Sequence, residues 1–429
     1  AGLSTQMVVS LVDSAMVGRL DNAQYALAAM GIGVLATWAL VSFFSSLATG
    51  THVIVARKFG EKDYIACGTA LNNSLILAVV IGSIVALLGL FAAKPLAQLF
   101  AADVTVGKYA GEYIFYRFLG IPFFLISVSY RGFYFGISKP KIFMISGVVT
   151  NLLNVVFNYI FIYGEFGLPQ MGLAGAGLGS TLATMFDMFF YFAVLMLPRY
   201  RNKFQNFKHF TIDWEVIKTI YKISLPVSFQ NVFILLGFLS FVAITGLIGT
   251  TEQAATQAII STLFISFLPC FGFGTAVQTL VGNSLGSGKI TLAKIYGFET
   301  AKIATYYTIA LSFIFILLPQ YMLLMITTDK VIIQTAVNPM RIAGVAQIFY
   351  AVGVVLANGL QAGGKTMFVM LADVLTNLLI FVPIAYFLGV YLGLGLTWAW
   401  AALPFYIICY SFSIYIKFRF GSWSVELIA

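Results

Sequence analysis

Long apolar runs, separated by short polar connections, follow one another along the whole chain. Each run is about the ~20 residues that cross a bilayer as an α-helix. The runs are continuous, whereas the strands of a membrane barrel alternate between apolar and polar residues. The pattern therefore predicts an all-α polytopic membrane protein with twelve transmembrane helices. The expected spans are residues 1–18, 25–55, 66–92, 108–136, 142–164, 172–198, 216–248, 253–283, 292–318, 333–360, 366–390 and 394–418.

An internal repeat relates the two halves of this pattern. The segment Thr150–Leu153 recurs 226 residues further on as Thr376–Leu379. A six-span unit that is duplicated keeps its orientation in the membrane, as in transporters with parallel repeats. We therefore expect two six-helix lobes related by a pseudo-two-fold axis along the membrane normal. The same offset pairs Gly60 with Gly286, Asp103 with Asp329, Lys139 with Lys365, and Gly167-Leu168 with Gly393-Leu394.

The one clearly polar connection, residues 199–215, lies between the sixth and seventh expected spans. It predicts an N-lobe of residues 1–198, a cytoplasmic linker of residues 199–215 and a C-lobe of residues 216–429. Ser224-Leu225-Pro226 opens the seventh span, and its repeat counterpart would fall before residue 1. The first span is thus expected to be truncated at its N-terminal end.

Basic residues are concentrated in alternate connections. The positive-inside rule places the basic connections and both termini in the cytoplasm, which suits a multi-pass protein of the cell inner membrane. The basic set is Arg57, Lys58, Lys62, Lys139, Lys141, Arg199, Arg201, Lys203, Lys208, Lys289, Lys294 and Lys365.

Composition narrows the function. The chain is 60% hydrophobic and 9% charged, against roughly 25% charged residues in soluble domains. The net charge of +9 arises mainly from the basic residues of the cytoplasmic connections and does not indicate a nucleic-acid partner. Three scattered cysteines and two histidines give no disulfide framework, metal spacing or nucleophile–base pair. We expect no enzyme, no cofactor and no metal beyond a coupling cation.

Three amides line one face of the fifth span. Asn151, Asn154 and Asn158 follow the i, i+3, i+7 spacing of a helix. Asp13, in the first span, is the deepest acid, and burying its charge costs at least ~2.5–3.5 kcal/mol. Asp187 and Asp373 are two further acids within spans, and their roles stay open.

The repeat separates scaffold from chemistry, because residues that the scaffold needs should recur in both halves. Asn151 recurs as Asn377, which favours a packing role. The counterparts of the other polar residues are apolar: Asn154 aligns with Ile380, Asn158 with Ile384, and Asp13 with Leu239 or Phe241.

The polar residues suit a monovalent cation. The Asp13 carboxylate together with neutral oxygens suits Na⁺, and the carboxylate alone could carry a proton. Ser180 and Thr181, early in the sixth span, are candidate hydroxyl ligands. The alternative is a hydrogen-bonded polar plug between helices.

These residues resemble the multidrug and toxic compound extrusion (MATE) family, of bacterial type. The resemblance rests on residues 12–18 (VDSAMVG), residues 50–60 (GTHVIVARKFG) with their counterpart 274–286, and residues 154–181. It implies a secondary antiporter in which two six-helix lobes form a V-shaped cavity, and a Na⁺ or H⁺ gradient drives export of amphiphilic, often cationic, compounds. It also implies an N-lobe cation site at positions that match Asp13, Asn154, Asn158 and Ser180 or Thr181.

The chain departs from the family at two places. Many members have a second Asp where this chain has Asn158, so the choice between Na⁺ and H⁺ stays open. NorM-type members often carry acids in the seventh and tenth spans, but residues 226–247 and 344–364 contain none. A C-lobe cation site of that type is therefore not expected.

The expected partners are organic-cation or amphiphilic substrates and membrane lipids, and the expected state is a monomer. The residues that bind the substrate are not predicted. The alternative function is a lipid-precursor or lipid-linked oligosaccharide flippase of similar architecture. Such a flippase should cluster Arg or Lys in a central cavity to bind phosphates, but only Arg117, Arg131 and Arg341 are candidates and they are dispersed.

Overall fold

A computed structural model describes residues 12–101, 103–208 and 211–423. Every regular element in these ranges is a helix. Ten helical segments are long and apolar enough to cross a membrane, and an eleventh is formed if α5 and α6, which meet at 45°, count as one span. The all-helical fold predicted from the sequence is confirmed. The first expected span, residues 1–18, lies mostly outside the described residues, although residues 12–17 are helical.

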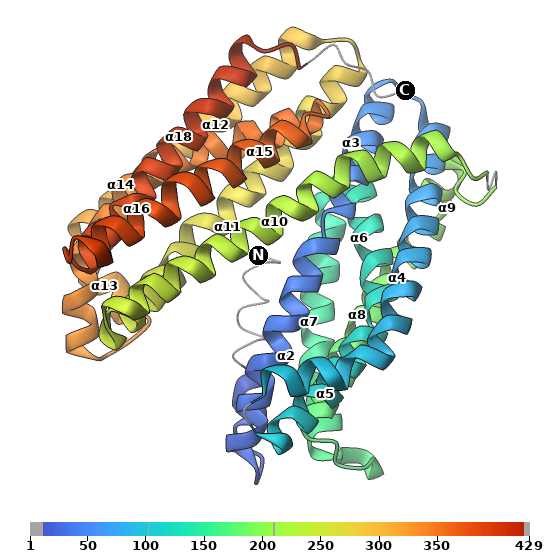
Figure 1. Ribbon diagram of the computed structural model, residues 1–429. Coiled ribbons are helices and arrows are strands. Elements are labelled where there is room, and N and C mark those ends of the chain that lie inside the picture. The colour runs from blue at the N-terminus through green and yellow to red at the C-terminus, as the bar shows by residue number, and fades with distance from the viewer. Residues whose placement is uncertain (1–11, 102, 209–210, 424–429) are drawn as a thin grey trace. The chain divides into compact units, whose positions relative to one another are not determined.

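The chain forms two compact units, of which unit 1 extends to Ser224 and unit 2 begins at Leu225. Figure 1 shows the helices of unit 1 in blue to green and those of unit 2 in yellow to red. Unit 1 contains α2 (Ala23–Phe44), α3 (Leu47–Gly60), α4 (Tyr64–Phe100), α5 (Val104–Leu119), α6 (Ile121–Gly136), α7 (Pro140–Tyr163), η1 (Glu165–Gly167), α8 (Leu173–Met196) and α9 (Pro198–Phe204). Helix α10 (Trp214–Ile248) passes from unit 1 into unit 2.

Unit 2 has the same alternation of long helices and short turns. It contains α11 (Thr250–Gly286), α12 (Ile290–Leu317), α13 (Pro319–Leu324), α14 (Lys330–Ala362), α15 (Thr366–Thr376), η2 (Asn377–Phe381), α16 (Val382–Tyr386), η3 (Phe387–Tyr391), α17 (Leu396–Trp400) and α18 (Ala402–Phe420). Its core is built around α14, which packs against α11, α12 and α18. The elements η2 and η3 are π-helical turns inside the eleventh expected span.

Helix ends account for much of the sequence repeat. Asp103 caps α5 by accepting hydrogen bonds from Thr105 N and Val106 N, and Asp329 caps α14 in the same way from Val331 N and Ile332 N. The backbone N–H groups of Val106 and Thr105 hold the pKa of Asp103 below its usual range. Such caps satisfy backbone donors that a helix leaves unpaired at its start.

The turns of the two units also share backbone conformation. Lys62 (φ 64°) and Gly288 (φ 72°) are repeat counterparts, and so are Ser138 (φ 60°) and Gly364 (φ 81°). Both pairs occupy the left-handed region, which only glycine adopts without a steric penalty. The turns of the two units therefore have the same backbone conformation even though unit 1 has Lys62 and Ser138 where unit 2 has glycines.

Candidate functional site

The candidate site lies where α7 and α8 pack closely. Glycines on α8 allow this approach: a Cβ at Gly175 would lie 2.5 Å from the Phe161 carbonyl group of α7. Asn154 and Asn158, one turn apart on α7, both point into the protein, with side chains 8% and 0% exposed. The helical turn of residues 12–17 supplies Asp13, which is half-buried.

Hydrogen bonds connect four of the five predicted residues. The Asn158 amide donates from Nδ2 to Asp13 Oδ1 at 2.8 Å and to Asn154 Oδ1 at 3.2 Å. The Asn154 amide in turn donates from Nδ2 to Ser180 Oγ at 3.1 Å. Residues from three helical segments therefore form one continuous polar chain, in which the bonded pair Asp13 and Asn158 is 145 positions apart in sequence.

The Asn158 side chain is only half satisfied. Its Oδ1 is buried and has no hydrogen-bond partner among the described residues. This oxygen faces Gly179, where a Cβ would come within 2.2 Å of it. A buried amide oxygen without a donor costs on the order of 1–3 kcal/mol, so a ligand that supplied a positive charge or a proton here would be stabilised.

The fifth predicted residue, Thr181, is turned elsewhere. Its hydroxyl donates to the Tyr116 carbonyl of α5 at 2.7 Å, and its side chain lies against Gly120. Of the two neighbouring hydroxyls that the sequence left open, the structure brings Ser180 to the Asp13 cluster and directs Thr181 to α5.

The comparison with known families decides what kind of protein carries this cluster. The MatE family model matches residues 2–160 and 226–387, one stretch in each unit. The chain belongs to the MatE family. The resemblance to the MATE family seen in the sequence is therefore confirmed.

Known MATE proteins resemble the chain over nearly its full length. Probable multidrug resistance protein NorM of Thermotoga maritima is 26% identical over 99% of this chain and 90% of its own length. Two solved structures are similar in fold. "Crystal structure of MATE in the straight conformation" has a TM-score of 0.87 at 21% identity, and "Outward-facing conformation of a multidrug resistance MATE family transporter of the MOP superfamily" has 0.86 at 22%. Each covers 98% of this chain, and the chain covers 92% of each.

Family membership establishes the broad class of protein. The chain is a multi-span membrane protein of a transporter family, with the all-α, two-lobe architecture predicted from its sequence. The prediction that it is not an enzyme is confirmed at this level, because the matching family consists of transporters. The five site residues and the identity of the coupling ion stay predictions.

The sequence did not predict that a charged residue, Arg117, lies near the cluster of Asp13, Asn158, Asn154 and Ser180. Arg117, on α5, interacts electrostatically with Asp13, and its buried Nε has no hydrogen-bond partner among the described residues. Arg117 was visible as a charge inside a span, but its approach to Asp13 depends on how α5 packs. Among the described residues no three His, Cys, Asp or Glu side chains could hold a metal ion together.

Two other acids within spans are satisfied by neutral donors. Asp187, on α8, accepts hydrogen bonds from the Ser146 and Thr150 hydroxyls of α7. Asp373, on α15, is 3% exposed and accepts from Gln230 Nε2 at 2.7 Å and from the Tyr406 hydroxyl at 2.6 Å. Neither acid has a salt-bridge partner among the described residues.

Proposed function

We propose that this protein is a secondary active antiporter that exports amphiphilic or cationic organic compounds in exchange for Na⁺ or H⁺. Export would proceed by alternating access of the two lobes, in the cell inner membrane with both termini cytoplasmic. The observation that carries the proposal is the Asp13–Asn158–Asn154–Ser180 chain, in which Asn158 Oδ1 lacks a donor.

The Asn158 NH₂ group is the basis on which we propose a position for the cation. It donates to two oxygens, Asp13 Oδ1 and Asn154 Oδ1, so the positive end of the amide dipole stands between them. Rotation of the amide by half a turn would bring Oδ1 to the same position. Na⁺ could then be held by one carboxylate and neutral oxygens of Asn154, Asn158 and Ser180. With H⁺ instead, the protonated Asp13 carboxyl would donate to Asn158 Oδ1.

The charge of Arg117 would favour release of the cation from this site. With the site empty, the guanidinium compensates part of the Asp13 charge. A bound cation removes that benefit and is repelled by Arg117. A substrate that favours the cation-free arrangement then competes with the cation through a shared conformational equilibrium, which is the thermodynamic basis of antiport.

The proposed coupling is confined to unit 1. Asp13, Asn154 and Asn158 have apolar repeat counterparts, and residues 226–247 and 344–364 contain no acid. The substrate class follows from the relative described as a probable multidrug resistance protein together with the resemblance to the MATE family.

Transport by reconstituted protein tests the proposal. Export of a fluorescent organic cation from liposomes should be driven by an imposed Na⁺ gradient or pH gradient, applied separately to identify the coupling ion. Asp13→Asn should reduce gradient-driven export to the background of empty liposomes. Asp103→Asn is the matched control, because Asn also caps helices and Asp103 is remote from the site in sequence and element. Full activity in Asp13→Asn would refute the coupling role, and lipid scrambling without dye export would favour a flippase.

A further inference from the structure

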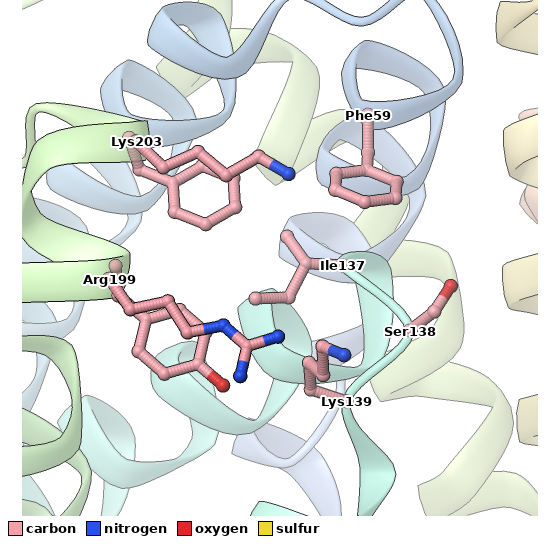
Figure 2. A pocket seen from close by; sticks show the side chains of 8 residues that line it. Phe59, Ile137, Ser138, Lys139, Arg199 and Lys203 are labelled. Atoms are coloured by element: carbon pink, nitrogen blue, oxygen red, sulfur yellow. The ribbon is translucent and has the colours of Figure 1, made fainter.

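A second polar feature of unit 1 lies away from the Asp13 cluster, at the ends of α3 and α6, the start of α7 and the short helix α9. These elements enclose a cavity of about 220 Å³. Figure 2 shows the side chains around it. The lining residues are Phe59, Ile137, Ser138, Lys139, Arg199, Tyr200, Lys203 and Phe204.

The cavity combines an apolar floor with a basic rim. Ile137 and Phe204 are buried, whereas Lys139, Arg199 and Lys203 are exposed. No acidic residue belongs to the lining. In Figure 2 the Arg199 side chain extends toward the side chain of Lys139. Three like charges around one hollow repel one another, and an anion placed between them would offset that repulsion.

Aromatic rings hold the third cation in position. Lys203 Nζ lies 4.0 Å from the centroid of the Tyr64 ring, 5.3 Å from that of Phe59 and 5.7 Å from that of Phe204. Cation–π contacts of this kind are worth about 0.5–1 kcal/mol at exposed sites. They fix the ammonium group without neutralising its charge, so Lys203 stays available to an anion.

The size and position of the cavity restrict the ligand. Pockets for drug-sized molecules measure roughly 300–1,000 Å³, so this cavity is too small for a transported drug. It adjoins the ends of helices α3 and α7, which belong to segments long and apolar enough to cross a membrane. Lipid headgroups lie at the ends of such helices, and basic pockets there suit phosphate-bearing headgroups. The apolar floor suits the first methylenes of the lipid chains but not a fully hydrated phosphate ion.

We propose that this cavity binds the headgroup of an anionic phospholipid, with Lys139, Arg199 and Lys203 around the phosphodiester. The proposal does not depend on cation-coupled transport. It explains why the chain places a short basic helix, α9, against the ends of α3 and α6 in what the sequence alone suggested was a polar linker.

Native mass spectrometry of the detergent-purified full chain, titrated with phosphatidylglycerol or phosphatidylcholine, tests this inference. The wild type should bind phosphatidylglycerol preferentially. The variant Lys139→Gln/Arg199→Gln/Lys203→Gln should lose on the order of 100-fold in affinity for phosphatidylglycerol, if each basic residue contributes about fivefold. The matched control, Lys289→Gln/Lys294→Gln/Lys365→Gln, removes the same charge from unit 2 and should stay within a factor of about two of wild type.

Two further measurements keep the test decisive. Lys139→Gln alone changes an exposed residue and should weaken phosphatidylglycerol binding by about fivefold without lowering the melting temperature, so a folding defect in the triple variant would not hide the effect. Inorganic phosphate at millimolar concentration should fail to displace the lipid. Displacement by phosphate, or equal lipid binding by the triple variant and the wild type, would overturn the proposal.

Discussion

The two units each contain a carboxylate within the membrane-spanning region, but the two groups are held differently. In unit 1, Asp13 is half-buried and accepts from Asn158, whose own Oδ1 is unpaired. In unit 2, Asp373 is 3% exposed, and each of its oxygens accepts a short hydrogen bond, one from Gln230 and one from Tyr406. Gln230 is itself held by Gln361 at 3.4 Å.

The difference indicates different tasks for the two acids. The Asp373 network joins α10, α14, α15 and α18, and leaves no oxygen of the carboxylate without a donor. It is the arrangement expected of a structural polar contact between helices. The Asp13 cluster joins three helical segments instead of four and keeps an unsatisfied acceptor at Asn158 Oδ1. This is the arrangement expected of a site that binds a ligand.

Substitution of Asp373 and of Asp13 should distinguish a structural carboxylate from a ligand-binding one. Asp373→Ala would leave Gln230 and Tyr406 as buried groups without their acceptor and should lower the free energy of unfolding by about 3 kcal/mol. Asp13→Ala should change it by less than about 1 kcal/mol. Thermal melting in a fixed detergent measures both. A larger loss for Asp13→Ala would reverse the comparison.

Glycines beside the buried amides provide a second contrast. Gly179 makes room for Asn158 in unit 1, and Gly237 makes room for Asn377 in unit 2, where an added Cβ would lie 1.8 Å from the amide oxygen. Either Gly→Ala change should destabilise its unit by about 1–3 kcal/mol through overpacking. Only Gly179→Ala should also alter the cation dependence of transport. Gly31→Ala, with no atom within 4 Å of the new Cβ, is the control for both measurements.

A second carboxylate in the cluster should sharpen the difference further. Asn158→Asp places another negative charge beside Asp13 and should raise the apparent affinity for the driving cation by roughly tenfold. Asn377→Asp changes a fully buried amide of unit 2 and should reduce stability without moving the cation dependence. The readout is initial dye-export rate against cation concentration. An equal shift in both variants would argue against a site confined to unit 1.

The smallest expected effect concerns the turns. Lys62 is in the left-handed region that its counterpart Gly288 occupies as a glycine. Lys62→Gly should therefore stabilise the protein, by up to about 1 kcal/mol, whereas Lys62→Ala should not, because alanine keeps the strain. Melting curves of the two variants give the answer. No difference between them would mean that the turn relaxes around the lysine.

Much of the fold could be predicted, because the length of each hydrophobic run determines where a membrane-spanning helix begins and ends. The expected span of residues 142–164 is α7, Pro140–Tyr163, and the expected span of residues 333–360 is α14, Lys330–Ala362. The π-helical turns at Asn377–Phe381 and Phe387–Tyr391 could not be predicted, since they depend on how neighbouring helices pack and carry no distinct composition.

The candidate site was predictable where helical spacing decides which side chains share a face. Asn154 and Asn158 are one turn apart, and they do form a hydrogen bond. Spacing alone could not choose between Ser180 and Thr181, because neighbouring residues point about 100° apart on a helix and the choice depends on where α5 and α7 lie. The approach of Arg117 to Asp13 is a tertiary contact and was missed for the same reason.

The π-helical turns of unit 2 have a consequence for how the duplication diverged. Ile380 lies inside the first of these turns and Ile384 lies just after it, whereas their counterparts Asn154 and Asn158 lie on an uninterrupted α-helix. A wider turn rotates the residues that follow it onto a different face. Asparagines introduced at positions 380 and 384 would therefore not face the direction that Asn154 and Asn158 face on α7. Unit 2 differs from unit 1 in the rotation of this helix as well as in its side chains. Point substitutions at these two positions would not reproduce the cluster of unit 1.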